Sequence, residues 1–185
     1  MEIFHKIAAF FFDMIEVVVV ALAIFVVVYL FLFQPHEVNG ASMEPNFHNN
    51  EFILTDKISY RFRLPQRGDV IIFRAPKNRE LDYIKRVIGL PGERVKIIDG
   101  SVYVNNQKLN EPYLSVGTVS NSGLFLPSNK EYLVLEDEYF VLGDNRTHSS
   151  DSREWGTVNR QDIVGKAWLR YWPPEVIGLI PAGKD

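Results

Sequence analysis

The chain has 185 residues, enough for one domain of ordinary size with an appendage. Its composition, 46% hydrophobic and 23% charged with a net charge of -3, is typical of a globular protein and offers no basic face to a nucleic acid. The absence of cysteine excludes disulfides, thiolate catalysis and thiolate metal sites. The histidines are scattered without the spacing of metal ligands, so we expect no metal site.

The most unusual feature is an apolar run near the N-terminus. Residues 17–33 read VVVVALAIFVVVYLFLF and contain no charge, Gly or Pro. As a helix the run is roughly 25 Å long, slightly short of a bilayer core of about 30 Å, and apolar residues before it cover the shortfall. Aromatic residues at both ends resemble the belts of membrane interfaces. We interpret residues 1–36 as a membrane anchor with its span at about 15–33.

Two alternatives to an uncleaved anchor stay open. A buried core helix is one, or a β-strand, since β-branched residues suit strands. A cleaved signal peptide is the other, although Lys6 is outnumbered by acidic residues at 2, 13 and 16 and no small-x-small site follows promptly. Lys6 precedes the run and no Lys or Arg follows it until Lys57, which favours a cytoplasmic N-terminus with the rest of the chain outside.

Beyond Gln34-Pro35, where the proline ends the predicted helix, the chain is β-like. Strands are predicted where apolar residues alternate or form short runs between turn signals. They are expected at 70–73, 83–88, 94–98, 102–105, 131–135, 139–142 and 164–171. Asp99-Gly100 predicts a hairpin, and residues 110–130 predict a loop. The fold class is therefore mainly β, an antiparallel domain over residues 37–185 whose sheet edges can bind an extended peptide.

Three polar segments carry residues that can do chemistry. Ser42 lies in a turn just beyond the apolar run, although most serines beside Gly and Pro are structural. Lys85 and Arg86 interrupt an apolar strand, and alternation predicts that one of the two faces the interior. A buried lysine has a lowered pKa and can act as a general base, whereas a solvated edge lysine is the ordinary alternative. The third segment, 143–156, contains Asp151 and Arg153, a pair worth little if it is solvated.

Together these segments resemble one family. The motifs are Gly-x-Ser-Met-x-Pro at 40–45, Arg-Gly-Asp-Val at 67–70, Lys-Arg-Val-Ile-Gly-Leu-Pro-Gly at 85–92 and Gly-Asp-Asn-Arg…Ser-x-Asp-Ser-Arg-x-Trp-Gly at 143–156. Their order, beyond an N-terminal apolar run, is similar to that of the type I signal peptidases of bacteria in their compact single-anchor form. The resemblance covers nearly the whole chain. It implies a β catalytic domain and a serine endopeptidase that cuts signal peptides from secreted precursors after small-x-small motifs.

The resemblance also implies roles for individual residues. Ser42 corresponds to the nucleophile and Lys85 to its general base, which together form a Ser–Lys dyad that needs no cofactor. Ser149 corresponds to a serine that hydrogen-bonds the lysine amine and orients it. Asp151 and Arg153 correspond to a pair that holds the wall of the active site rather than reacting.

Three positions beside the implied nucleophile need separate comment. Met43 follows it as in the family and is expected to pack beneath it. Asn46 stands where the family usually has threonine. Gly40 stands where some members have a serine whose hydroxyl helps to form the oxyanion hole, which leaves more of that role to the Ser42 N–H. We expect Gly40→Ser to be at least as active as the parent, unless Gly40 has a positive φ that a Cβ would strain.

The implied partners are signal peptides and the lipid bilayer, without nucleic acid, at a bacterial cell membrane. The sequence makes no prediction of oligomeric state. An organellar inner-membrane peptidase stays open as an alternative. A self-cleaving Ser–Lys repressor or mutagenesis protein is disfavoured by the apolar run, and a non-catalytic anchored scaffold by the presence of both Ser42 and Lys85.

Overall fold

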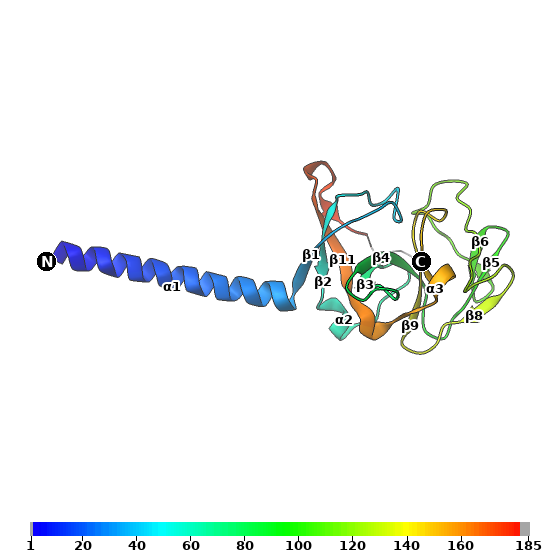
Figure 1. Ribbon diagram of the computed structural model, residues 1–185, viewed down its shortest axis with the longest axis horizontal. Coiled ribbons are helices and arrows are strands. Elements are labelled where there is room, and N and C mark those ends of the chain that lie inside the picture. The colour runs from blue at the N-terminus through cyan, green and yellow to red at the C-terminus, as the bar shows by residue number, and fades with distance from the viewer. Residues whose placement is uncertain (1, 182–185) are drawn as a thin grey trace.

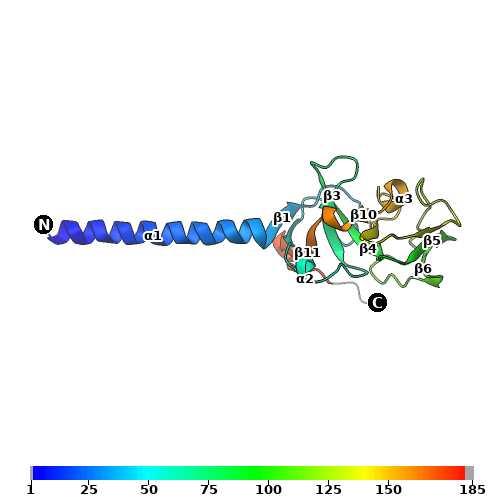
Figure 2. The same cartoon turned by 90° about the horizontal axis from the view of Figure 1, so that it is seen from below.

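The computed structural model describes residues 2–181, so Met1 and the last four residues of the predicted β domain lie outside it. A long helix, α1 (Glu2–Phe31), projects from a β domain that contains all the described strands (Figure 1). The view from below shows the same separation (Figure 2). The stretch Phe4–Tyr29 has a mean hydropathy of 2.7 and is long and apolar enough to cross a membrane. Its most apolar window is 0% buried, unlike the core helix that was one alternative.

The helix has different limits from the span expected at about 15–33. It covers Glu2–Phe31 and ends before Gln34-Pro35, because β1 (Phe33–Glu37) begins almost at once. Pro35 is tolerated in β1 because this strand lies at the edge of its sheet, where one side needs no N–H donor. Phe33 stacks on Trp168 with ring centroids 5.2 Å apart. The sheet therefore begins at Phe33, ahead of the domain boundary expected between residues 36 and 37.

The strands form two sheets in which every pair is antiparallel. The larger has the order β1-β2-β11-β3-β4-β9-β10, with β12 beside β11, and the smaller has the order β7-β6-β5-β8. The larger adds to β1 the strands β2 (Phe52–Asp56), β3 (Val70–Arg74), β4 (Asp82–Gly89), β9 (Glu138–Leu142), β10 (Val158–Asn159), β11 (Ile163–Trp172) and β12 (Gly178–Leu179). The smaller contains β5 (Arg94–Ile98), β6 (Ser101–Val104), β7 (Gln107–Lys108) and β8 (Glu131–Leu133).

Short helical segments complete the fold. They are α2 (Ser59–Phe62), α3 (Ser152–Trp155) and two 3₁₀ turns, Arg160–Asp162 and Pro174–Val176. Each strand predicted from the sequence is present, with its ends displaced by a residue or two. Asp99 and Gly100 both have positive φ, 48° and 73°, as the predicted hairpin requires, and residues 110–130 contain no strand. β1, β2 and the two-residue strands were not predicted from the sequence.

Three hydrophobic clusters meet at β4, which is why this strand is buried on both faces. Ile84 belongs to a cluster with Met43 and Phe47, beneath the turn that follows β1. Ile88 packs into the cluster between the smaller sheet and β9. Val87 packs with residues of β3 and β9 in the third. A polar side chain on either face of β4 is therefore enclosed by protein.

Candidate active site

Ser42 lies in a tight turn whose shape is fixed by its own backbone and by the core below. The backbone N–H groups of Asn46 and Phe47 both donate to the Met43 carbonyl, each at 3.0 Å. Met43 and Phe47 are buried in the cluster that contains Ile84. Met43, the residue directly after the serine, thus anchors the turn on the core. Ser42 stands at the start of the turn and is half-buried.

Lys85 approaches this hydroxyl from β4. Its Nζ donates to Ser42 Oγ and to the Ile84 carbonyl, each at 2.8 Å, and the residue is 4% exposed. Burial lowers the pKa of Lys85 to about 8, although the charges of Asp151 and Asp144 act in the opposite direction. No ion pair within residues 2–181 includes this lysine. A substantial fraction of the amine is therefore neutral near pH 8.

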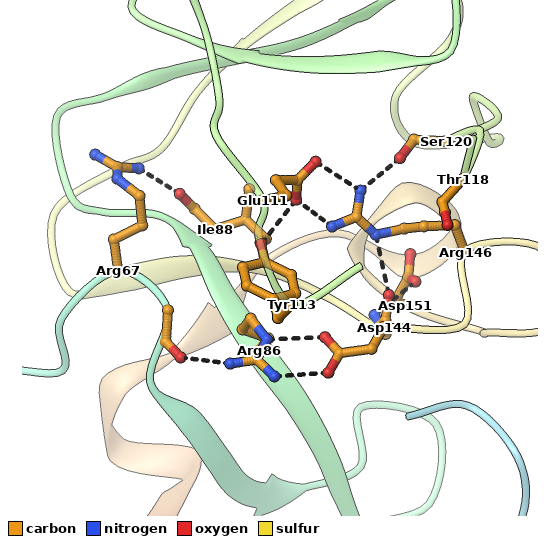
Figure 3. A network of polar contacts seen from close by, with 12 residues as sticks. Arg67, Arg86, Ile88, Glu111, Tyr113, Thr118, Ser120, Asp144, Arg146 and Asp151 are labelled. Atoms are coloured by element: carbon orange, nitrogen blue, oxygen red, sulfur yellow. Dashed lines mark hydrogen bonds and ion pairs between the residues drawn. The ribbon is translucent and has the colours of Figure 1, made fainter. Parts of the chain in front are cut away.

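Arg86, the next residue, points to the other face and is equally buried, so protein encloses both basic side chains, where alternation predicted that one of the two faces the interior. The Arg86 guanidinium makes two hydrogen bonds to Asp144, Nε to Oδ1 at 2.8 Å and Nη2 to Oδ2 at 2.6 Å. It also donates to the Gly68 carbonyl at 2.9 Å and lies over the Tyr113 ring, 4.0 Å from its centroid (Figure 3). Its charge is thus fully compensated.

Asn46 joins this paired charge to the nucleophile turn. Its Nδ2 donates at 2.8 Å both to Asp144 Oδ2 and to the Tyr113 carbonyl. Beyond Glu111, the buried Arg146 donates hydrogen bonds to Glu111 and Ser120 (Figure 3). Sequence reasoning treated Asn46 only as a departure from a family pattern and did not find this network. The polar Gly-Asp-Asn-Arg motif beside an apolar strand was its one visible signal.

Residues 143–145 contact the nucleophile turn and hold its backbone in place. Asn145 donates from its backbone N to the Ser42 carbonyl and from Nδ2 to the Ala41 carbonyl, each at 3.0 Å. Gly143 approaches the turn so closely that a Cβ there would lie 2.4 Å from the Ser42 carbonyl oxygen and 2.2 Å from Ser149 Oγ. Such distances require glycine. The contact couples the position of the serine to the loop that follows β9.

Ser149, Asp151 and Arg153 lie together behind Gly143. Arg153 donates to both carboxylate oxygens of Asp151 at 2.8 Å, and Asp151 also accepts from the Gly143 N–H at 3.0 Å. Asp151 is 0% and Arg153 4% exposed, so the pair is buried rather than solvated. Ser149 Oγ is buried and has no hydrogen-bond partner among the described residues. The bond from Ser149 to Lys85 that the resemblance implies is therefore not made here.

Gly40 has a backbone conformation that decides an open question. Its φ is +94°, and its N–H donates to Asn49 Oδ1 at 2.7 Å. A Cβ would meet no atom within 4 Å, so a side chain has space there. The conformation nevertheless favours glycine, because L-residues are strained at such φ values. The expectation that serine is harmless at this position is therefore replaced by its alternative, a strained turn.

A cleft of about 230 Å³ opens beside the dyad. One wall is formed by residues 36–39 and Ser42 and the other by residues 82–85, with Ile53 and Ile72 at the base. β1 is an edge strand of the larger sheet, and β4 pairs with β9 only from Arg86 onward. Each wall therefore has a strand edge that no other strand pairs with. Within residues 2–181 no group of three or more His, Asp or Glu side chains is placed to hold a metal ion. The cleft suits an extended peptide.

A serine hydroxyl against a buried, neutralisable amine, at one end of a peptide-sized cleft, is the arrangement of a serine peptidase that uses a lysine base. Known proteins agree with this class. The family model described as signal peptidase, peptidase S26, matches residues 11–172. A probable signal peptidase I-2 of Synechocystis sp. is 39% identical over 158 residues, which are 81% of this chain and 68% of that protein.

A second relative is also described as a signal peptidase. Signal peptidase IB of Staphylococcus aureus is 35% identical over 167 residues, 84% of this chain and 86% of its own. The crystal structure of a signal peptidase I from Enterococcus faecalis V583 aligns with a TM-score of 0.46 at 34% identity, over 56% of this chain and 97% of that one. The chain belongs to the signal peptidase I (peptidase S26) family, serine endopeptidases that remove signal peptides.

Proposed function

We propose that this chain cuts signal peptides from secretory precursors with Ser42 as nucleophile and Lys85 as general base. The observation that carries the proposal is the 2.8 Å contact between Lys85 Nζ and Ser42 Oγ, made by an amine that has no ion-pair partner among the described residues. Burial without a carboxylate partner is what allows an amine to lose its proton near neutral pH. An amine that stayed charged would be unable to accept the serine proton.

The chemistry follows from the neutral amine. A neutral lysine amine has two N–H bonds and one lone pair. It can therefore donate to the Ile84 carbonyl while its lone pair accepts from the Ser42 hydroxyl. Lys85 takes the hydroxyl proton while Ser42 Oγ bonds to the scissile carbonyl carbon, and the charged lysine then gives that proton to the leaving amine. In the second half the lysine takes a proton from water while the water oxygen bonds to the acyl carbon. The ester bond to Ser42 Oγ then breaks, and the lysine returns the proton to Oγ, which releases the acyl group as a carboxylic acid and restores Ser42.

The developing oxyanion needs a donor close to the nucleophile. The Ser42 N–H is available, since it donates no hydrogen bond within residues 2–181. Gly40 supplies no side-chain donor. The Asn145 Nδ2 contact to the Ala41 carbonyl supports this role, because that carbonyl and the Ser42 N–H belong to the same peptide unit. The backbone N–H of Ser42 is therefore the donor that we assign to the oxyanion.

The cleft supports cleavage after small-x-small sequences. An extended peptide that adds a strand between the two unpaired edges turns alternate side chains to the same face. The first and third residues before the cut would then both point to the base formed by Ile53 and Ile72. Because the cleft is only about 230 Å³, small side chains at these two positions allow the backbone to approach Ser42.

The membrane arrangement is also part of the proposal. Residues 1–36 would be a single-pass anchor with the N-terminus in the cytoplasm, and the domain from residue 37 to 185 would work on the outer face of a bacterial cell membrane. The apolar helix and its one flanking lysine, Lys6, support this orientation. Confinement to the surface that holds the precursors raises their effective concentration at the cleft.

The test is cleavage of a secretory precursor by the purified full chain in lipid vesicles, followed by identification of the new N-terminus. We expect one cut directly after a small-x-small sequence, and no cut with Ser42→Ala. A cut at another kind of sequence, or an undiminished cut by Ser42→Ala, would contradict the proposal.

A further inference from the structure

A basic segment of the β domain begins beside the end of the apolar helix. Residues 57–67 read KISYRFRLPQR, with Lys or Arg at 57, 61, 63 and 67 and no acidic residue, although the whole chain has a net charge of -3. The backbone N–H of Lys57 donates at 3.0 Å to the carbonyl of Leu32, the residue directly after α1. Both views show α2 on the side of the domain from which α1 emerges (Figure 1, Figure 2).

A cavity of about 220 Å³ opens on this segment. Three cations line it, namely Lys57 at the end of β2, Arg61 in α2 and Arg160 in the turn before β11. The rest of the described lining is apolar or aromatic and comprises Tyr60, Pro65, Ile163 and Val164. The fold thus gathers positive charge around one cavity from segments that lie far apart in the sequence. Such a cavity attracts an anion.

Two of these cations are available to a ligand. Arg61 and Arg160 are exposed, and within residues 2–181 neither guanidinium makes an ion pair or a hydrogen bond. Nearby carboxylates have other partners, because Asp56 accepts from two backbone N–H groups at the start of α2 and Asp162 pairs with Arg79. A guanidinium can bind two oxygens of a phosphate at once. A phosphate group is therefore the anion that we expect.

The surface beside the cavity carries large apolar side chains as well as cations. Phe62 and Leu64 follow Arg61 closely in the chain and are 84% and 53% exposed. They lie beside the end of a helix that is long and apolar enough to cross a membrane. A basic segment with exposed apolar residues can bind lipid headgroups with its cations and contact acyl chains with its apolar side chains. A free phosphate would use only the cations, so a lipid fits the surface better.

We propose that Arg61 and Arg160, with Lys57 beside them, bind the phosphate of an anionic phospholipid in the leaflet that faces the β domain. This inference rests on α1 as a membrane span, which is part of the proposed function, and adds a second attachment to the bilayer. The helix alone leaves the domain free to rotate about the helix axis. A headgroup held beside α2 restricts that rotation, and with it the direction in which the cleft opens along the membrane surface.

The experiment measures lipid binding, so its result does not depend on cleavage. The full chain is first reconstituted in vesicles and washed at alkaline pH, which removes proteins that do not span the bilayer. In a neutral detergent it is then titrated by calorimetry with short-chain phosphatidylglycerol, short-chain phosphatidylcholine or inorganic phosphate. The parent is compared with the double variant Arg61→Gln/Arg160→Gln, with folding checked by circular dichroism.

The matched control is Arg94→Gln/Lys130→Gln. It removes the same charge, but Arg94 lies in β5 and Lys130 directly precedes β8, so both belong to the smaller sheet at the end of the domain far from α1 (Figure 1). A general effect of net charge on lipid binding would appear equally in both double variants. A site beside α2 would appear only in the first.

We expect the parent to bind phosphatidylglycerol at least about tenfold more tightly than the other two ligands. Arg61→Gln/Arg160→Gln should lose at least about tenfold in this affinity, since each cation near an anionic lipid surface contributes roughly fivefold. The control should bind like the parent. Equal weakening in both double variants, or no preference for phosphatidylglycerol over phosphatidylcholine in the parent, would overturn the site.

Two other outcomes separate the lipid from its alternatives. Inorganic phosphate that binds as tightly as phosphatidylglycerol would assign the cavity to a free anion and overturn the lipid assignment. A full chain that the alkaline wash removes from the vesicles would overturn the anchor in the proposed function, and the inference with it. A chain that stays in the vesicles but shows no loss of phosphatidylglycerol binding in Arg61→Gln/Arg160→Gln would overturn the inference alone.

Discussion

Lys85 and Arg86 are neighbours on β4 and are equally buried, yet their charges meet opposite surroundings. The Arg86 guanidinium has two bonds to the Asp144 carboxylate and a third to a backbone carbonyl. Among the described residues, the Lys85 amine contacts only neutral groups: a hydroxyl, a carbonyl and the Tyr83 ring, whose centroid lies 5.5 Å away. A guanidinium cannot lose its proton in proteins, so it needs a partner, whereas an amine can escape the cost of burial by becoming neutral. The two faces of one strand thus separate a structural cation from a chemical base.

The largest effect should come from removing the base or the nucleophile. Ser42→Ala and Lys85→Ala should each lower kcat by a factor on the order of 10⁶, and the double variant should be no worse than either, since the pair acts as one unit. Lys85→Arg should be equally inactive because guanidinium stays charged. Single-turnover assays with a precursor measure these losses, and comparable activity in any of these folded variants would exclude the dyad.

Replacing Lys85 or Arg86 with methionine tests the difference between the two faces of β4. Arg86→Met leaves Asp144 buried and unpaired, so the free energy of unfolding should fall by about 3–5 kcal/mol. Lys85→Met removes a charge without an ion-pair partner and should stabilise the protein while abolishing activity. Denaturant titrations of the two variants against the parent measure both changes. Equal destabilisation by the two substitutions would show that the faces of β4 are not different.

The stabilisation by Lys85→Met should depend on pH in a defined direction. The pKa of Lys85 is lowered from 10.5 to about 8 on folding, so the unfolded chain binds the extra proton between these pH values. Below pH 8, burial of the charged lysine therefore lowers the free energy of unfolding by its full amount, about 3 kcal/mol. This destabilisation decreases as pH rises toward 10.5. Titrations at several pH values should show the difference between the variant and the parent shrinking over this window.

A smaller effect is expected where the loop after β9 touches the nucleophile turn. Gly143→Ala places a Cβ against the Ser42 carbonyl, and the required shift should move the hydroxyl away from Lys85. A displacement of about 1 Å can cost on the order of 10² in rate. Measurement of kcat should show this loss with little change in KM. Full activity in the variant would mean that the contact between loop and turn is dispensable.

The smallest effect is expected at Gly40, where φ rather than space is limiting. Gly40→Ser should cost about 1–2 kcal/mol in stability, because the residue must adopt a left-handed conformation, and its turnover should fall below that of the parent. Gly40→Ala is the matched control, since it carries the same strain without a hydroxyl. A serine variant at least as active as the parent would show that the hydroxyl outweighs the strain.

The fold could largely be predicted because its strands are marked by alternation and by turn residues such as Asp99-Gly100. β1 escaped prediction because Pro35 is acceptable only in an edge strand, and edge position is a property of the whole sheet. The burial of both basic side chains of β4, rather than one of them, could not be predicted for a similar reason. The packing on the Arg86 face comes from segments far away in the sequence, and no local pattern contains that information.

The candidate dyad was found through combined motifs, whereas its surroundings were not. The contact from Asn46 to Asp144 joins residues that are 98 apart in sequence, and nothing in either segment indicates the other. The φ of Gly40 is a backbone angle that glycine permits but does not require. His36 was counted only as a scattered histidine, because its partner Asp82 comes from another strand.

Burial without an ion-pair partner among the described residues is what makes Lys85 a base. The most direct test is the pH dependence of kcat/KM for a soluble peptide substrate, which reports the ionisation of essential groups in the free enzyme. The rate should rise with pH through a midpoint near the Lys85 pKa of about 8 and then level off. A rate that keeps rising toward the ordinary lysine value of 10.5 would contradict it, because the amine would then be charged despite its burial.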